Sequence, residues 1–270
     1  MEFNKAITIA KYIHKIYKKI GIEEQLNFDS IIDSRYPQIL SRLQNYSKIA
    51  KIAICSTNGK KSTVNYINQI LEANNQTYIT NVDINAKILP ILTSIILNLK
   101  DENLSIENLK DYYVMAFNEF ELAQYFNTMK FDYLLLNNIF IDHKDFSSLN
   151  AKRKNIQNAI KLNSKLKLII NADEPMYYGI DEISGDVLNG KKRKKVYFGF
   201  NNIEYYQNDY NYSQKNDLIR CPLCGCELQY EKNYYSHLGY YNCECSFKRP
   251  KLDYSIDAKI FNNYNLLSVY

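Results

Sequence analysis

The chain has 270 residues, of which 46% are hydrophobic, and a formal net charge of +5 at pH 7. This composition excludes a disordered polypeptide and is sufficient for one large domain, or for one domain with a smaller module. The charge is too small and too dispersed to indicate nucleic-acid binding, and no segment has the run of about 18 apolar residues that crosses a bilayer.

The first predicted element is an amphipathic helix over residues 3–21. The isoleucines Ile9, Ile13, Ile16 and Ile20 recur at helical spacing. Lysines occupy positions between them, which makes the helix amphipathic. We expect the apolar face to pack on the body of the protein. Contact of the basic face with a membrane surface is the alternative that stays open.

Farther along the chain, short apolar runs alternate with helical patterns. Strands are predicted at residues 51–54, 112–115, 132–136, 166–170 and 196–198. Helices are predicted between them, at residues 62–73, 86–99, 121–129 and 151–162. Such alternation is typical of βαβ units, in which helices cover a parallel sheet. The predicted fold class is therefore α/β with a mostly parallel sheet.

The first of these strands runs directly into a polar loop and then into a helix. The loop consists of Ser56, Thr57, Asn58, Gly59, Lys60, Lys61 and Ser62. A strand, a tight turn and a helix N-terminus form an anion site, because backbone N–H groups and the helix dipole point at one spot. We therefore predict that nucleotide phosphates bind here, with Lys60 as the principal charge. A strict P-loop has a glycine in place of Ile54 and a hydroxyl in place of Lys61.

Five of the six cysteines lie in one short segment near the C-terminal end. They include two close pairs, Cys221 with Cys224 and Cys243 with Cys245. This spacing is typical of a zinc ribbon, in which four thiolates surround one Zn²⁺ and leave no open position for chemistry. Cys226 is a spare that could replace one of them, and His237 is either a nitrogen ligand or a packed neighbour. A set of disulfides is the remaining alternative.

The polar loop and three later segments resemble, in chain order, motifs of the Mur ligases, the ATP-dependent amide-forming enzymes of cell-wall synthesis. Residues 56–60 resemble the G-T-N-G-K loop, and residues 138–145 resemble an N-x-x-x-D-H-x-D segment. Residues 171–175 resemble an N-A-D-D-P strand end, and residues 117–119 fall where the family has an acidic strand end. Residues 221–250 resemble the zinc-ribbon insertion of the MurT subunits.

The resemblance implies an enzyme subunit and its ligands. MurT subunits pair with a glutamine amidotransferase subunit, GatD, and amidate the D-glutamate of lipid II to D-isoglutamine. ATP, Mg²⁺ and Zn²⁺ are the implied cofactors. Lys60, His143 and Glu119 are the implied catalytic residues, with His143 as a magnesium ligand. Nucleotide contacts are also implied for residues 56–62 and for Asn138, Asn171 and Asp173.

The resemblance further implies a division of the chain into four parts. Residues 1–40 form a helical segment, 41–215 an ATP-binding central domain, 216–255 a zinc-ribbon insertion, and 256–270 the start of the return to the central domain. Family members continue into a C-terminal domain, whereas this sequence stops at Tyr270. A cytoplasmic protein is expected, with peripheral contact to the inner face of the membrane as an option and without a nucleic-acid partner.

Two residues depart from the family pattern. Lys61 replaces a Mg²⁺-binding threonine, and Ala116 replaces a metal-binding glutamate, which leaves Glu119 or Glu121 as substitutes. We therefore expect this chain alone to be a weak or inactive ligase whose nucleotide affinity depends little on Mg²⁺. Two other functions stay open: a catalytically silent nucleotide-binding scaffold, and a zinc-ribbon protein whose tyrosine-rich hairpin stacks on nucleic-acid bases.

Overall fold

The structure is a computed structural model of the chain. It describes residues 3–19, 47–83, 88, 91–98, 110–140, 146–181, 193–205 and 220–260. The implied magnesium ligand His143, together with Asp142 and Asp145 of the same motif, lies outside the described residues.

A seven-stranded sheet has the strand order β2-β3-β1-β4-β5-β6-β9. Its strands are β1 Ser47–Cys55, β2 Tyr78–Thr80, β3 Lys110–Phe117, β4 Tyr133–Leu136, β5 Lys167–Asn171, β6 Lys195–Tyr205 and β9 Tyr254–Ile260. The pairs β2–β3, β4–β5, β5–β6 and β6–β9 are parallel. Parallel neighbours need long crossover connections, which helices supply. The predicted α/β fold class is thus confirmed.

The helices follow the predicted pattern, with ends that differ from the prediction by a few residues. They are α1 Phe3–Lys19, α4 Lys60–Ala73, α5 Ile91–Asn98, α6 Leu122–Thr128, α7 Phe146–Lys161 and the 3₁₀ turn η3 Pro175–Tyr177. Helix α5 begins at Ile91, five residues later than predicted; the predicted range included Pro90, a residue type that is unfavourable inside a helix. None of the described helices is long and apolar enough to cross a membrane.

The chain divides into two compact units. The first comprises Met1–Ala53, Lys61–Ala116 and Asn127–Asp132, and the second comprises Ile54–Lys60, Phe117–Phe126 and Tyr133–Tyr270. Strands β1 and β3 therefore begin in the first unit and end in the second. The division into four parts implied by the sequence stays a prediction.

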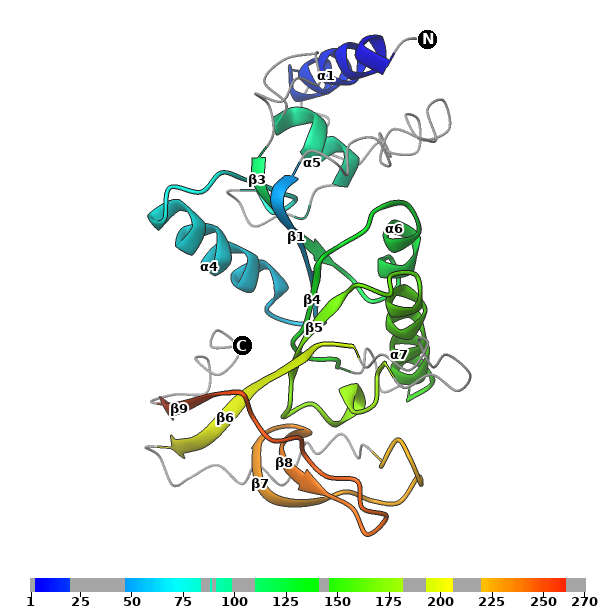
Figure 1. Cartoon of the computed structure of the whole chain (residues 1–270), viewed down its shortest axis with the longest axis vertical. Coiled ribbons are helices and arrows are strands. Elements are labelled where there is room, and N and C mark those ends of the chain that lie inside the picture. The colour runs from blue at the N-terminus through cyan, green and yellow to red at the C-terminus, as the bar shows by residue number, and fades with distance from the viewer. Residues whose placement is uncertain are drawn as a thin grey trace. The chain divides into compact units, whose positions relative to one another are not determined.

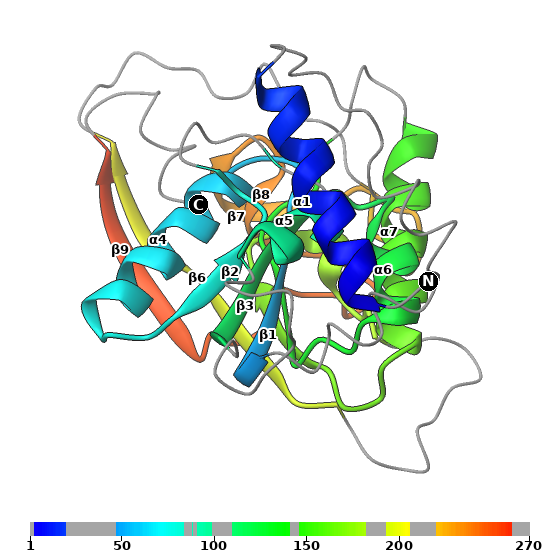
Figure 2. The same ribbon diagram turned by 90° about the horizontal axis from the view of Figure 1, so that it is seen from above.

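In the first unit, helix α5 supplies much of the core. Residues 91–96 are all buried, with Thr93 and Ser94 among them, whereas Leu97 and Asn98 at its end are exposed. Helix α1 lies beside α5 in Figures 1 and 2, and its Ile7 is fully buried. Ile9 and Ile16 of α1 remain about two-fifths exposed, at 41% and 40%. The N-terminal helix thus packs on its own unit through part of its apolar residues.

In the second unit, helix α7 connects β4 to β5. It buries residues at helical spacing, namely Leu149, Lys152, Ile156, Ala159 and Ile160. Strand β9, which was not predicted, pairs with β6 from Phe198↔Tyr254 onward. Both views show β6 and β9 side by side. The chain therefore returns to the main sheet after the cysteine-rich segment.

We call residues 220–250 the cysteine module. It contains an antiparallel hairpin of β7 Gln229–Tyr235 and β8 Leu238–Asn242, drawn in orange in Figure 1. Gly239 is required in this hairpin, because a Cβ atom there would lie 2.3 Å from the carbonyl oxygen of Lys232. The hairpin is therefore tightly packed around its turn.

Candidate functional site

The predicted phosphate-binding loop, residues 56–62, follows β1 and includes the first residues of α4. Gly59 has a φ of +78°, a conformation that favours glycine. The Lys60 ammonium donates to the carbonyl oxygens of Ser56, at 2.9 Å, and Thr57, at 3.3 Å. The loop therefore folds around the ammonium group that was predicted to bind phosphates.

Asn138, at the end of β4, holds the middle of this loop. Its side-chain Oδ1 accepts the N–H of Asn58 at 2.9 Å, and its Nδ2 donates to the Asn58 carbonyl oxygen at 3.0 Å. The Asn138 carbonyl oxygen accepts the N–H of Thr57 at 3.0 Å. One buried side chain thus pairs with both backbone groups of Asn58 and fixes the shape of the loop.

Glu119 lies beside the same loop, just after β3. The Thr57 hydroxyl donates to the Glu119 carboxylate and accepts the N–H of Phe140 at 3.0 Å. Glu119 is 3% exposed, whereas Glu121 lies on the surface. Of the two substitutes considered for the missing glutamate at Ala116, Glu119 is therefore the one next to the loop. A carboxylate oxygen is a ligand that Mg²⁺ prefers.

Lys61 occupies the first turn of helix α4 and is exposed. Ser62, in the same turn, is half-buried. N–H groups in the first turn of an α-helix have no partner within the helix, so this end of α4 is suited to anions. The contacts of Lys61 and Ser62 with nucleotide stay predictions.

The implied nucleotide residues at the end of β5 have protein partners. Oδ1 of Asn171 accepts the N–H of Asp173 at 3.0 Å. The buried Asp173 carboxylate forms an ion pair with Arg249 of the cysteine module, and its other oxygen accepts the N–H of Phe200 at 2.9 Å. A Cβ atom on Gly199 would lie within 2.9 Å of this ion pair. Asp173 thus has a structural role that sequence reasoning missed.

Three further residues that sequence reasoning missed brace residues 138–140. The Glu174 carboxylate accepts the N–H of Ile139 at 3.1 Å, and the Tyr177 hydroxyl donates to the Asn138 carbonyl oxygen at 3.0 Å. Lys152, 1% exposed, donates from Nζ to the Phe140 carbonyl oxygen at 2.9 Å. Lys152 could have been found from the sequence, because it falls on the apolar face of the predicted helix. A lysine is almost never fully buried unless it is paired, so its position indicates a buried partner.

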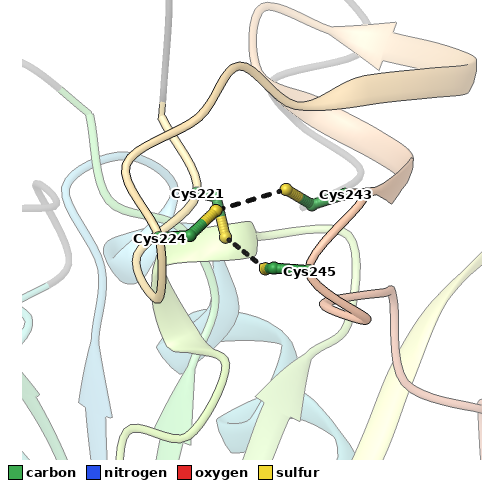
Figure 3. A group of neighbouring side chains, drawn as sticks. All are labelled: Cys221, Cys224, Cys243 and Cys245. Carbon is green, nitrogen blue, oxygen red and sulfur yellow. Dashed lines mark hydrogen bonds between the residues drawn. The ribbon is translucent and has the colours of Figure 1, made fainter.

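The cysteine module brings four sulfur atoms together (Figure 3). The Sγ atoms of Cys221, Cys224, Cys243 and Cys245 all lie within 4.8 Å of one another. Two of these distances, Cys221–Cys245 and Cys224–Cys243, are 3.5 Å. Tetrahedral Zn²⁺ with bonds of about 2.3 Å requires sulfurs about 3.8 Å apart, so the cluster fits this ion. The four residues are those named from the sequence, and zinc itself stays a prediction.

The structure distinguishes the four proposed ligands from the alternatives, which were disulfides, Cys226 and His237. All six cysteines are free thiols, so the disulfide arrangement is not present. Cys226 is not part of the four-sulfur cluster. His237 is buried against Glu174 and Phe140 and is likewise not part of the cluster. Hydrogen bonding, first from the backbone of Cys226, lowers the pKa of Cys224 to about 6, whereas burial raises the pKa of Cys221. Cys224 is therefore more readily ionised than Cys221 in the cluster without metal.

The chain was compared with known proteins, and a family model matches most of it. Residues 54–243 match the Mur ligase middle domain. The subunit MurT of lipid II isoglutaminyl synthase (glutamine-hydrolyzing) from Staphylococcus aureus strain COL is 28% identical over 241 residues, which cover 81% of this chain and 51% of the relative. The Streptococcus pneumoniae R6 subunit of the same name is also 28% identical, with coverage of 79% and 45%. This chain spans about half the length of these relatives.

A solved structure gives the same fold. A pseudomurein peptide ligase type C from Methanothermus fervidus superposes with a TM-score of 0.59 and 21% sequence identity. The superposition covers 89% of this chain and 45% of that protein. The likeness therefore extends over most of this chain and less than half of the ligase.

Proposed function

Because this chain belongs to the Mur ligase family, we propose that it is the ATP-binding subunit of a MurT-type amide ligase. In the proposed reaction, ATP phosphorylates the D-glutamate carboxylate of lipid II, and ammonia from a GatD-like glutaminase subunit displaces the phosphate to give D-isoglutamine. The likeness to the two MurT subunits supports this reaction. The observation that carries the proposal is the loop around Lys60, held by Asn138 and flanked by Glu119.

The proposed role of Lys60 follows from its contacts. Its ammonium is bound by two carbonyl oxygens, which are neutral acceptors. Phosphate oxygens carry negative charge and form stronger, charge-assisted hydrogen bonds, so the ammonium would turn to the β- and γ-phosphates. N–H groups at the start of α4 would bind the same anion. Positioning and charge stabilisation of this kind supply most of the catalysis in phosphoryl transfer.

Within the part of the chain that the structure describes, Glu119 is the residue proposed to bind magnesium. It presents a buried carboxylate to the loop, and Thr57 fixes its orientation. Glu119 would hold Mg²⁺ at this position, and the ion would there supply neutralisation of the charge on the transferring phosphoryl group. His143 is proposed as a further ligand from its motif alone.

The cysteine module is proposed to hold one structural Zn²⁺ through Cys221, Cys224, Cys243 and Cys245. Four thiolates close the coordination sphere, so this site stabilises the module and does no chemistry. We also propose the four-part division of the chain given above, and a cytoplasmic location at the inner face of the membrane, where the protein would reach lipid II.

The test is a glutamine-dependent amidation assay on the chain with its glutaminase partner, ATP, Mg²⁺ and a lipid II analogue, followed by mass spectrometry. The proposal predicts D-isoglutamine that requires both subunits, with weak or no product from this chain alone. Lys60→Ala is the matched negative control. Nucleotide binding without any amide product in the complex would instead support the catalytically silent scaffold, which the departures at Lys61 and Ala116 favour.

A further inference from the structure

The cysteine module contacts the phosphate-binding side of its own unit at the end of β5. The Gly239 N–H donates to the Asp173 carbonyl oxygen at 3.0 Å, and Arg249 pairs with the Asp173 carboxylate. The rings of Phe247 and Tyr178 lie 4.6 Å apart. These contacts attach the module independently of His237.

His237 makes a different contact, which attachment of the module does not require. Its Nε2 lies 2.8 Å from Oε2 of Glu174, and the side chains of both residues are fully buried. Its ring meets the ring of Phe140 edge-on, with centroids 5.0 Å apart. A buried carboxylate needs hydrogen-bond donors, so His237 stabilises Glu174 in its present position.

The same Glu174 oxygen accepts the N–H of Ile139, while the other oxygen accepts the N–H of Met176. Ile139 lies between the two residues that grip the phosphate-binding loop. Asn138 pairs with both backbone groups of Asn58, and Phe140 donates its N–H to the Thr57 hydroxyl. Contacts therefore run without a break from His237, through Glu174 and residues 138–140, to the loop.

We propose that His237 is a positioning residue through which the cysteine module holds residues 138–140, and with them the phosphate-binding loop, in the conformation that binds nucleotide. This inference rests on the proposed function, because it assumes that the loop binds nucleotide. It gives the module a role in nucleotide affinity, although none of its residues needs to touch the nucleotide.

Calorimetry with an ATP analogue tests the proposal on three variants of the full chain. His237→Phe keeps a ring but removes the donor to Glu174, and it should weaken analogue affinity about tenfold. His237→Gln places an amide donor in a similar position and should restore affinity to within about threefold of the parent. Glu231→Ala changes an exposed residue of the same hairpin and should leave affinity unchanged. Equal affinity of His237→Phe and the parent would overturn the proposal.

Hydrogen exchange gives a readout that general destabilisation would not reproduce. In His237→Phe, amides of residues 138–140 should exchange faster, while those of β8 keep the protection of the parent because Gly239 and Arg249 still anchor the hairpin. Uniformly faster exchange over the whole unit would contradict a positioning role. If His237→Phe does not fold, His237→Asn replaces it, since its shorter amide does not reach Glu174.

Failure of this inference differs from failure of the proposed function. If the parent binds no analogue, the nucleotide function is wrong and this inference with it. If the parent binds, Lys60→Ala does not, and His237→Phe binds like the parent, the loop is the nucleotide site and only the role of His237 is wrong.

Discussion

At the scale of single residues, the sequence predicted best the order of strand, loop and helix around Lys60, and phosphate binding at this loop stays a prediction. Lys60 and Gly59 are adjacent to a strand and a helix, so local order alone indicates an anion site. The partners of Asp173 and Glu174 could not be predicted in this way. Arg249 is 76 residues from Asp173, and His237 is 63 residues from Glu174. Such pairs form only when the chain has folded.

Lys60→Ala should weaken binding of an ATP analogue by at least about tenfold, because it removes the charged partner of the phosphates. Isothermal titration calorimetry measures the effect. Lys154→Ala, which removes an exposed lysine from α7, is the matched control and should bind like the parent. Unchanged affinity in Lys60→Ala would reduce the loop to a simple connection between β1 and α4.

Asn138→Asp should weaken binding of an ATP analogue more than Asn138→Ala. Both variants lose the donor to the Asn58 carbonyl oxygen, and aspartate keeps an acceptor for the Asn58 N–H, but it adds a negative charge where phosphates are expected to bind. Calorimetry should therefore rank the variants as parent, alanine and aspartate in order of falling affinity. An aspartate variant that binds better than the alanine variant would contradict phosphate binding at this loop.

Arg249→Met should destabilise the protein by about 3–5 kcal/mol, because it leaves the buried Asp173 carboxylate without its cation. The second single variant, Asp173→Asn, removes the negative charge that Arg249 compensates. The double variant should therefore lose less free energy of unfolding than the sum of the two single variants. Urea unfolding measures all four proteins, and simple additivity would mean that the ion pair contributes nothing specific.

At the scale of elements, periodicity located the strands and helices but not their ends. Strand β2 was missed because it has three residues, too few to show an alternating pattern. Strand β9 was missed because the cysteine module separates it in sequence from β6, its partner in the sheet. The module itself was detectable, since close cysteine pairs signal a metal site without any knowledge of the rest of the fold.

Cysteine substitution separates the metal site from the spare thiol. Cys221→Ser should lower bound zinc from one equivalent toward zero and lower the melting temperature, because the metal contributes folding free energy. Cys226→Ser should retain both, since its sulfur is not part of the four-sulfur cluster. Elemental analysis of protein purified without chelator gives the stoichiometry. Absence of zinc from the parent protein would refute the metal assignment.

At the scale of the whole molecule, the fold and the family are assigned, whereas the reaction is inferred from a loop, a carboxylate and relatives about twice as long. Glu119 is proposed to offset in part the carboxylate that the resemblance places at Ala116, because it lies beside the loop. Lys61 stands where the resemblance places a metal-binding hydroxyl. We therefore expect nucleotide affinity of this chain to change little when Mg²⁺ is removed, and calorimetry with and without EDTA measures the difference. A large loss of affinity would show that Glu119 and its neighbours form a complete magnesium site.

Nucleotide phosphates are proposed to bind at residues 56–62, and a crystal structure with an ATP analogue and Mg²⁺ would show their position. We expect the β- and γ-phosphates at the start of α4, with the Lys60 ammonium moved from the Ser56 and Thr57 carbonyl oxygens to the phosphate oxygens. An analogue bound elsewhere, with Lys60 still on those two carbonyl oxygens, would contradict the proposal.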